Sequence, residues 1–151
     1  MSVKVGDKAP DFSLQGTGSR EYRLSEYLGQ PVVIVFYPGD GTPVCTKQLN
    51  EYNDGLEQFV GLGAQVLAIS SQGVESKEDF ASKNGFEFPL LADVDKTAAK
   101  AYGILGPLGF PRRSVFVVDA SGIIRYVHRA LAGVTYRPVA ELVEAINAAR
   151  G

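Results

Sequence analysis

Apolar and polar positions follow two different periods along the chain. The runs at residues 31–36 and 66–69 are apolar at nearly every position, which is typical of strands buried on both faces of a sheet. A second pattern predicts a helix over residues 43–60, because apolar residues recur there at spacings of three and four. The predicted buried stripe consists of Leu49, Tyr52, Leu56, Phe59 and Val60.

Strands and helices alternate over the rest of the chain, which closes with a hairpin and a helix. Further strands are predicted at residues 11–14, 22–24, 88–92, 115–118 and 123–127, and further helices at residues 25–28, 76–83, 95–102 and 139–150. Pro89 marks its segment as an edge strand, since proline cannot donate to a ladder, and Asp95 is the predicted cap of the helix that follows. This order predicts an α/β fold with a mixed central sheet and helices on both faces, and a single domain over residues 1–151.

Composition and charge exclude several classes of protein. The apolar fraction of 45% and the charged fraction of 21% are those of a globular domain and not of a disordered chain. A net charge of −2 gives no electrostatic basis for binding nucleic acid or an anionic membrane. The apolar runs are far shorter than the roughly 20 residues that span a bilayer. Asp93, Asp95 and Asp119 lack the histidine or cysteine neighbours of a transition-metal site, and we expect them to be turn and cap residues.

The single cysteine bears on the cellular compartment. One cysteine cannot form an internal disulfide, and a chain without a disulfide framework fits a reducing cytosol. Residues 1–7 also lack the apolar core of an export signal. We therefore expect a cytoplasmic protein.

Cys45 is predicted to lie in the first turn of the helix 43–60. Thr42 is a good N-cap and Pro43 is favoured at the first helical position, which makes Cys45 the third helical residue. A thiol at that position lies near backbone N–H groups without helical acceptors and at the positive end of the helix dipole, a setting that favours the reactive thiolate. A free cysteine is also often a small buried hydrophobic residue. The residues alone therefore leave a reactive thiol and an inert thiol equally open.

Several segments resemble one protein family. Residues 36–46, with the sequence Phe-Tyr-Pro-Gly-Asp-Gly-Thr-Pro-Val-Cys-Thr, resemble the peroxiredoxin motif Pro-x-x-x-Thr/Ser-x-x-Cys. Residues 113–119 are similar to the family's Arg-x-x-Phe-x-x-Asp segment, and residues 6–14 and 88–93 to its opening segment and mid-chain strand. The chain thus resembles one-cysteine peroxiredoxins of the AhpC/TSA family, in particular the AhpE and bacterioferritin-comigratory-protein (PrxQ) groups. The resemblance implies a thioredoxin fold with an N-terminal extension and an insertion.

The resemblance also implies roles for four residues. Cys45 would be the nucleophile that attacks peroxide, and Thr42 would hydrogen-bond the thiolate and the peroxide oxygen. Arg113 would hold the thiolate and polarise the O–O bond, while Pro38 would shield the sulfur from water. No metal or organic cofactor is implied. Thr42, Pro38 and Arg113 each have a structural alternative. Thr42 would only cap a helix, Pro38 would only end a strand, and Arg113 would lie beside Arg112 as a solvated side chain at the start of a strand.

Two positions depart from the family's pattern. Gln48 stands where glutamate is usual, and it keeps hydrogen-bonding capacity but loses the charge that would pair with the arginine. The orientation of the arginine is therefore left open. Asn50 stands where some relatives carry a second cysteine. His128 is the only histidine, and we expect a structural role for it, with a general-base role as the less favoured alternative.

A lone cysteine makes the expected reaction cycle depend on an external thiol. Attack on peroxide leaves a sulfenic acid, which a second thiol must reduce. Thioredoxin, a glutaredoxin-like protein or a low-molecular-weight thiol could serve as the reductant, and the sequence does not choose among them. We expect hydrogen peroxide and organic hydroperoxides as substrates, and a homodimer is favoured weakly over a monomer.

Two other functions use the same residues. A peroxide-sensing redox relay protein would use the chemistry of Cys45 to signal, and a thioredoxin-fold binding module would contain an inert thiol. The apolar loop at residues 105–111 also has two interpretations. It is either a packed connection or a hydrophobic rim that favours organic hydroperoxides.

Overall fold

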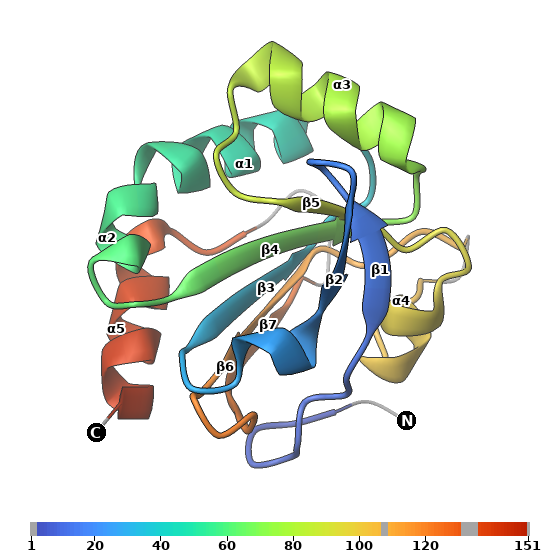
Figure 1. Ribbon diagram of the computed structural model, residues 1–151. Helices are drawn as coiled ribbons and strands as arrows, with labels where there is room; N and C mark the ends of the chain where they lie inside the picture. The colour runs from blue at the N-terminus through green and yellow to red at the C-terminus, as the bar shows by residue number, and fades with distance from the viewer. Residues whose placement is uncertain (1–2, 107–108, 131–135, 151) are drawn as a thin grey trace.

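A seven-stranded mixed sheet forms the centre of the molecule (Figure 1). The computed structural model describes residues 3–106, 109–130 and 136–150. The strands lie in the order β2-β1-β5-β4-β3-β6-β7, and β3, β4 and β5 run parallel while the other neighbours are antiparallel. The strands are β1 (Ser13–Gly16), β2 (Arg20–Arg23), β3 (Val32–Phe36), β4 (Gln65–Ser70), β5 (Leu90–Ala92), β6 (Ser114–Val118) and β7 (Ile124–Arg129).

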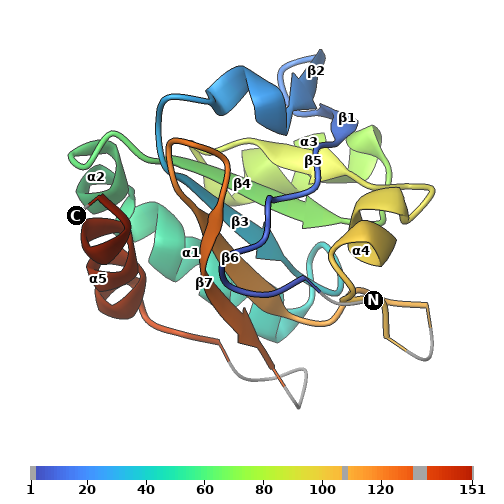
Figure 2. The same cartoon turned by 90° about the horizontal axis from the view of Figure 1, so that it is seen from below.

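Helices cover both faces of this sheet, as Figure 2 shows for α1 and α5 on one side and α4 on the other. The helices are α1 (Pro43–Asp54), α2 (Leu56–Val60), α3 (Val74–Asn84), α4 (Thr97–Ala101) and α5 (Val139–Arg150), with a 3-10 turn, η1 (Leu24–Tyr27). The prediction of an α/β fold with a mixed sheet and helices on both faces is confirmed. None of the helices in the described part of the chain has both the length and the apolar character that crossing a membrane requires.

Strand β3 divides the core into two halves. Val33 and Val35 face the half that contains α1 and α5, whereas Ile34 and Phe36 face the half that contains α4. All four side chains are fully buried, because successive residues of a strand point to opposite faces and both faces are covered. The prediction of a strand buried on both faces is therefore confirmed.

The prediction that residues 88–92 form an edge strand is wrong. Strand β5 pairs with β4 on one side and with β1 on the other, so it lies inside the sheet. Pro89 precedes the strand and takes part through its carbonyl, which accepts a hydrogen bond from the Ala68 N–H. The predicted cap of α4 is also wrong, because Asp93 and not Asp95 accepts from the N–H groups that begin that helix.

The predicted helix 43–60 is interrupted at Gly55, which separates α1 from α2. A Cβ atom on Gly55 would lie only 2.9 Å from Cγ1 of Val139, so the start of α5 packs directly against the backbone here. The predicted apolar stripe therefore does not continue unchanged to its last residue, Val60. Phe59 stays fully buried, whereas Val60 is 62% exposed and is not part of the core.

A buried ion pair fixes the loop between β3 and α1. The Asp40 carboxylate in this loop accepts from Lys77 Nζ at 2.9 and 3.0 Å and from Ser76 Oγ at 2.6 Å. The Tyr37 hydroxyl donates to the same carboxylate, and Lys77 also donates to Ser70 Oγ at the end of β4. Burial lowers the pKa of Lys77, and the charge of Asp40 opposes that effect. The loop that leads to Cys45 is thus tied to both α3 and the sheet.

We expect Lys77→Met to lower the free energy of unfolding by about 3–5 kcal/mol, because it leaves the nearly inaccessible Asp40 carboxylate without its cation. Urea denaturation measures the loss. Lys83→Met is the matched control, because Lys83 pairs with Asp79 at the surface, where such a pair contributes less than about 1 kcal/mol. Equal losses in the two variants would contradict the structural role of the buried pair.

Candidate active site

The register of the sheet brings two distant segments together. Strand β6 runs antiparallel to β3, with Ser114 opposite Phe36. Arg113, which immediately precedes β6, therefore lies where the chain leaves β3 for the loop and α1. Residues 68 positions apart in the sequence meet at this end of the sheet.

Cys45 is the third residue of α1, as predicted, and its sulfur lies against Arg113. Arg113 Nη2 donates to Cys45 Sγ at 3.0 Å. Both side chains are buried, with Cys45 at 0% and Arg113 at 3% exposure. The sulfur thus accepts a charge-assisted hydrogen bond from a buried guanidinium.

The other nitrogen of the guanidinium is held by Gln48. Arg113 Nη1 donates to Gln48 Oε1 at 2.5 Å, and Gln48 Nε2 donates to the Tyr52 hydroxyl at 3.3 Å. That hydroxyl in turn donates to the main-chain carbonyl of Arg137 at 2.7 Å. Burial raises the pKa of Tyr52 to about 12, with the hydrogen bond from Gln48 opposing it, so the hydroxyl keeps its proton at neutral pH. The amide of Gln48 thus orients Arg113, which the sequence had left open.

Thr42 and Pro38 lie in the same loop but are not shown in contact with the sulfur. Thr42 occupies the N-cap position of α1, as predicted, although its hydroxyl does not cap the helix. It donates instead to the Gly39 carbonyl at 3.1 Å. Pro38 is half-buried directly after Tyr37. Their roles in the chemistry therefore stay predictions.

The two arginines ahead of β6 point to different places. Arg112 donates to the Ala130 carbonyl, and Arg113 is the one that turns to Cys45, as the sequence spacing had favoured. His128 is half-buried on β7. Burial is the main cause that lowers its pKa, and the positive charge of Arg137 is a smaller cause in the same direction. No contact among the described residues joins its imidazole to Cys45.

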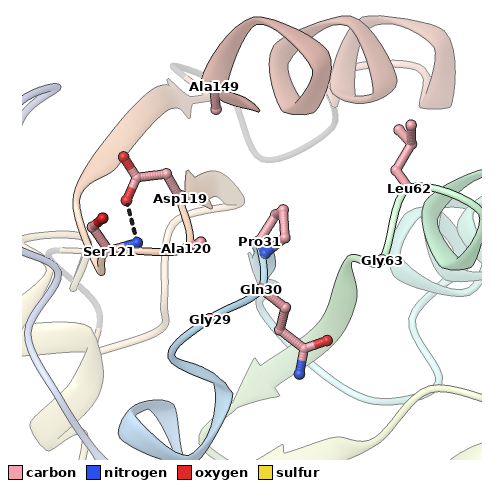
Figure 3. Close-up of a pocket in the computed structure, with 9 residues that line it drawn as sticks. All are labelled: Gly29, Gln30, Pro31, Leu62, Gly63, Asp119, Ala120, Ser121 and Ala149. Atoms are coloured by element: carbon pink, nitrogen blue, oxygen red, sulfur yellow. Dashed lines mark hydrogen bonds between the residues drawn. The ribbon is translucent and has the colours of Figure 1, made fainter. Parts of the chain in front are cut away.

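Two pockets lined by described residues contain none of the four predicted site residues. Figure 3 shows a pocket between the loop after η1, the loop after α2 and the turn that follows β6. Its one carboxylate, Asp119, already accepts from the Ser121 N–H and from Arg125. A second cleft lies between the Cys45 loop and α3, and is lined by Asp40, Gly41 and Thr46 among others.

One candidate site from the sequence remains to be placed, the hydrophobic rim. In the loop 105–111, Pro107 and Leu108 lie outside the described residues, while Phe110 is 59% exposed. The hydrophobic rim therefore stays a hypothesis. Within the described ranges, no group of three or more His, Cys, Asp or Glu side chains is arranged to hold a metal ion.

Known proteins resemble the chain over most of its length. The model of the AhpC/TSA family matches residues 5–127. Chloroplastic peroxiredoxin Q of Sedum lineare is 38% identical over 128 residues, which are 83% of this chain and 69% of that protein. The counterpart of Oryza sativa subsp. japonica is 37% identical, and the match covers 83% of this chain and 59% of the rice protein. The chain thus spans roughly 60% to 70% of the length of these relatives.

These relatives contradict the expected cytoplasmic location, because they are chloroplastic proteins. The expectation rested on the absence of a disulfide framework and of an apolar signal core. Neither property distinguishes the cytosol from another reducing compartment, so the cytoplasmic prediction is wrong by this comparison.

Solved structures give the same result for the fold. The structure of Xylella fastidiosa PrxQ superposes with a TM-score of 0.89 at 29% identity, and covers 100% of this chain and 99% of that one. Peroxidoxin BcpB of Mycobacterium tuberculosis superposes with a TM-score of 0.83 at 32% identity, over 97% of this chain and 96% of that one. The thioredoxin fold is confirmed, and the peroxide-sensing alternative is not favoured. By its family match and its relatives the chain belongs to the AhpC/TSA family of peroxiredoxins, and its single cysteine fits the one-cysteine type.

Proposed function

We propose that the chain is a thiol-dependent peroxidase that reduces hydrogen peroxide and organic hydroperoxides at Cys45. The observation that carries this proposal is the hydrogen bond from Arg113 Nη2 to Cys45 Sγ inside a buried site. Burying the charged guanidinium of Arg113 costs free energy unless it has hydrogen-bond partners. A cysteine that only filled space in the core would not require such a charged group beside it. Family membership supports the same chemistry.

In the first step the Cys45 thiolate attacks one oxygen of the peroxide. A sulfur–oxygen bond forms and the O–O bond breaks, so sulfur is oxidised by two electrons. The other oxygen leaves with the electron pair of the broken bond, takes a proton and departs as water or an alcohol. Arg113 faces the reacting atoms and stabilises the negative charge as it moves to the leaving oxygen. The Thr42 hydroxyl turns from the Gly39 carbonyl, to which it donates at 3.1 Å, and donates its proton to the peroxide instead. Pro38 keeps water from the sulfur.

In the second step an external thiol reduces the Cys45 sulfenic acid. The thiol displaces water and forms a mixed disulfide, and a further thiol releases Cys45 as its own sulfur is oxidised to a disulfide. The donor is thioredoxin, a glutaredoxin-like protein or a low-molecular-weight thiol. Because the Cys45 side chain is fully buried, the residues packed over the sulfur must move before any of these donors can reach it. Assembly into a homodimer stays a prediction.

We expect Cys45→Ser to abolish peroxide reduction and Arg113→Lys to slow it about 100-fold, since lysine cannot reach Gln48 and the sulfur together as the planar guanidinium does. The chain contains no tryptophan, so the rate is measured by competition with a haem peroxidase for hydrogen peroxide. Arg112→Lys is the matched control and should stay within about twofold of the parent. A Cys45 that reacts no faster than free cysteine would refute the proposal.

We also expect overoxidation of Cys45 when no reductant is present. A peroxide pulse should add about 32 Da to the protein, because the sulfenic acid has no second cysteine to resolve it and takes up another oxygen to form sulfinic acid. Intact-protein mass spectrometry measures the shift. The Cys45→Ser variant serves as the control and reports any oxidation of the single methionine. An unmodified parent protein after the pulse would count against the proposed chemistry.

Continuous turnover is expected with at least one thiol donor of the three classes. Steady-state consumption of peroxide is followed with each donor in turn, beside Cys45→Ser. A peroxidase consumes many equivalents of peroxide per chain, because the donor regenerates the thiol. Consumption that stops after one equivalent with every donor would instead indicate a sensor.

A further inference from the structure

Gln48 makes two different hydrogen bonds with the two ends of one amide. Its Oε1 accepts from Arg113 Nη1 at 2.5 Å, and its Nε2 donates to the Tyr52 hydroxyl at 3.3 Å. Gln48 and Tyr52 are both fully buried. An exchange of the two ends would set the Nε2 donors against a guanidinium, which is itself only a donor. The function of Arg113 therefore depends on which end of the amide faces it.

The direction of this arrangement is set at its far end. The Arg137 main-chain carbonyl can only accept, and the Tyr52 hydroxyl donates to it at 2.7 Å. With its one proton used in that bond, the hydroxyl offers only lone pairs to Gln48, so the amide must turn its NH₂ end toward Tyr52. The raised pKa of Tyr52 keeps the phenol protonated and this direction unchanged at neutral pH.

We propose that Tyr52 is a positioning residue for the peroxidase reaction, which, together with the Arg137 carbonyl, selects the end of the Gln48 amide that faces Arg113. This proposal rests on the proposed function. It assigns to Tyr52 a role beyond the apolar stripe of α1, since the ring packs in the core and the hydroxyl orders a chain of donors and acceptors that ends at Cys45 Sγ.

The need for Tyr52 follows from the amide chemistry of Gln48. A glutamate at position 48 would present two equivalent acceptor oxygens, and either one can receive the guanidinium. The hydroxyl of Tyr52 would then have nothing to select. The proposal therefore predicts that the effect of removing this hydroxyl depends on the residue at position 48.

The test is a double-mutant cycle read as the second-order rate constant for hydrogen peroxide. Tyr52→Phe should slow the reaction about tenfold in the Gln48 background, because a buried amide loses the acceptor that orients it. In the Gln48→Glu background the same change should alter the rate by no more than about twofold. Equal losses in both backgrounds would show a packing effect and overturn the proposal, as would a Tyr52→Phe variant with the parent rate.

Tyr136→Phe is the matched control. Tyr136 packs edge-on against the Tyr52 ring at 6.2 Å between centroids, and its own hydroxyl donates to Glu51. It lies outside the chain of hydrogen bonds, so its rate should match the parent. A slow parent protein would refute the proposed function itself, whereas a fast parent with an unchanged Tyr52→Phe rate would refute only the role of Tyr52.

Should the Gln48→Glu variants not fold, the side-chain amide signal of Gln48 in a ¹⁵N NMR spectrum decides the question. It should shift in Tyr52→Phe and stay in place in Tyr136→Phe. An amide signal that Tyr52→Phe leaves unchanged would overturn the proposal.

Discussion

The guanidinium of Arg113 lies 3.0 Å from the sulfur of Cys45, and both groups are shut off from solvent. A buried cation is stable only beside groups that accept its hydrogen bonds. Much of the surrounding structure meets that requirement. The antiparallel register of β3 and β6 delivers the arginine, the first turn of α1 delivers the sulfur, and the amide of Gln48 receives a further donor of the guanidinium.

Two polar networks hold this contact from opposite sides. On one side the Asp40–Lys77 pair ties the loop ahead of Cys45 to α3 and the end of β4. On the other side Gln48 and Tyr52 connect Arg113 to the main chain that precedes α5. The networks differ in kind, because the first joins opposite charges and the second is a directional series of neutral donors and acceptors. The first therefore fixes where the loop lies, and the second fixes how the guanidinium is turned.

Local patterns in the sequence predicted what local physics determines. The continuous apolar run of β3 and the Thr-Pro start of α1 were sufficient to place Cys45 in the first helical turn. The interior position of β5 was not predictable, because it depends on pairing with β1 from the far end of the chain. The break at Gly55 likewise depends on the packing of Val139. These contacts leave no trace in the periodicity of a single segment.

The same limit applied to the candidate site. Cys45 stood out by its place in the first helical turn and Arg113 by a motif that resembles a family, whereas Tyr52 fits the apolar stripe of its helix and so predicts a core residue. Its polar partner is a carbonyl 85 residues away, and a main-chain carbonyl has no sequence signature. The pair of Asp40 and Lys77 was missed for a related reason. A lysine in a helix is most often solvated, and only the fold reveals that this one is fully buried.

In the proposed reaction, the chemistry alters the contact that makes it possible. The thiolate that attacks in this reaction is an anion beside Arg113, and opposite charges attract strongly where water is excluded. Oxidation to sulfenic acid replaces that anion with a neutral group, while Gln48 on the other side of the guanidinium contributes a dipole but no charge. The attraction between Arg113 and residue 45 is therefore weaker after the reaction than before it. A weaker contact lowers the cost of uncovering the sulfur at the stage when an external thiol must reach it.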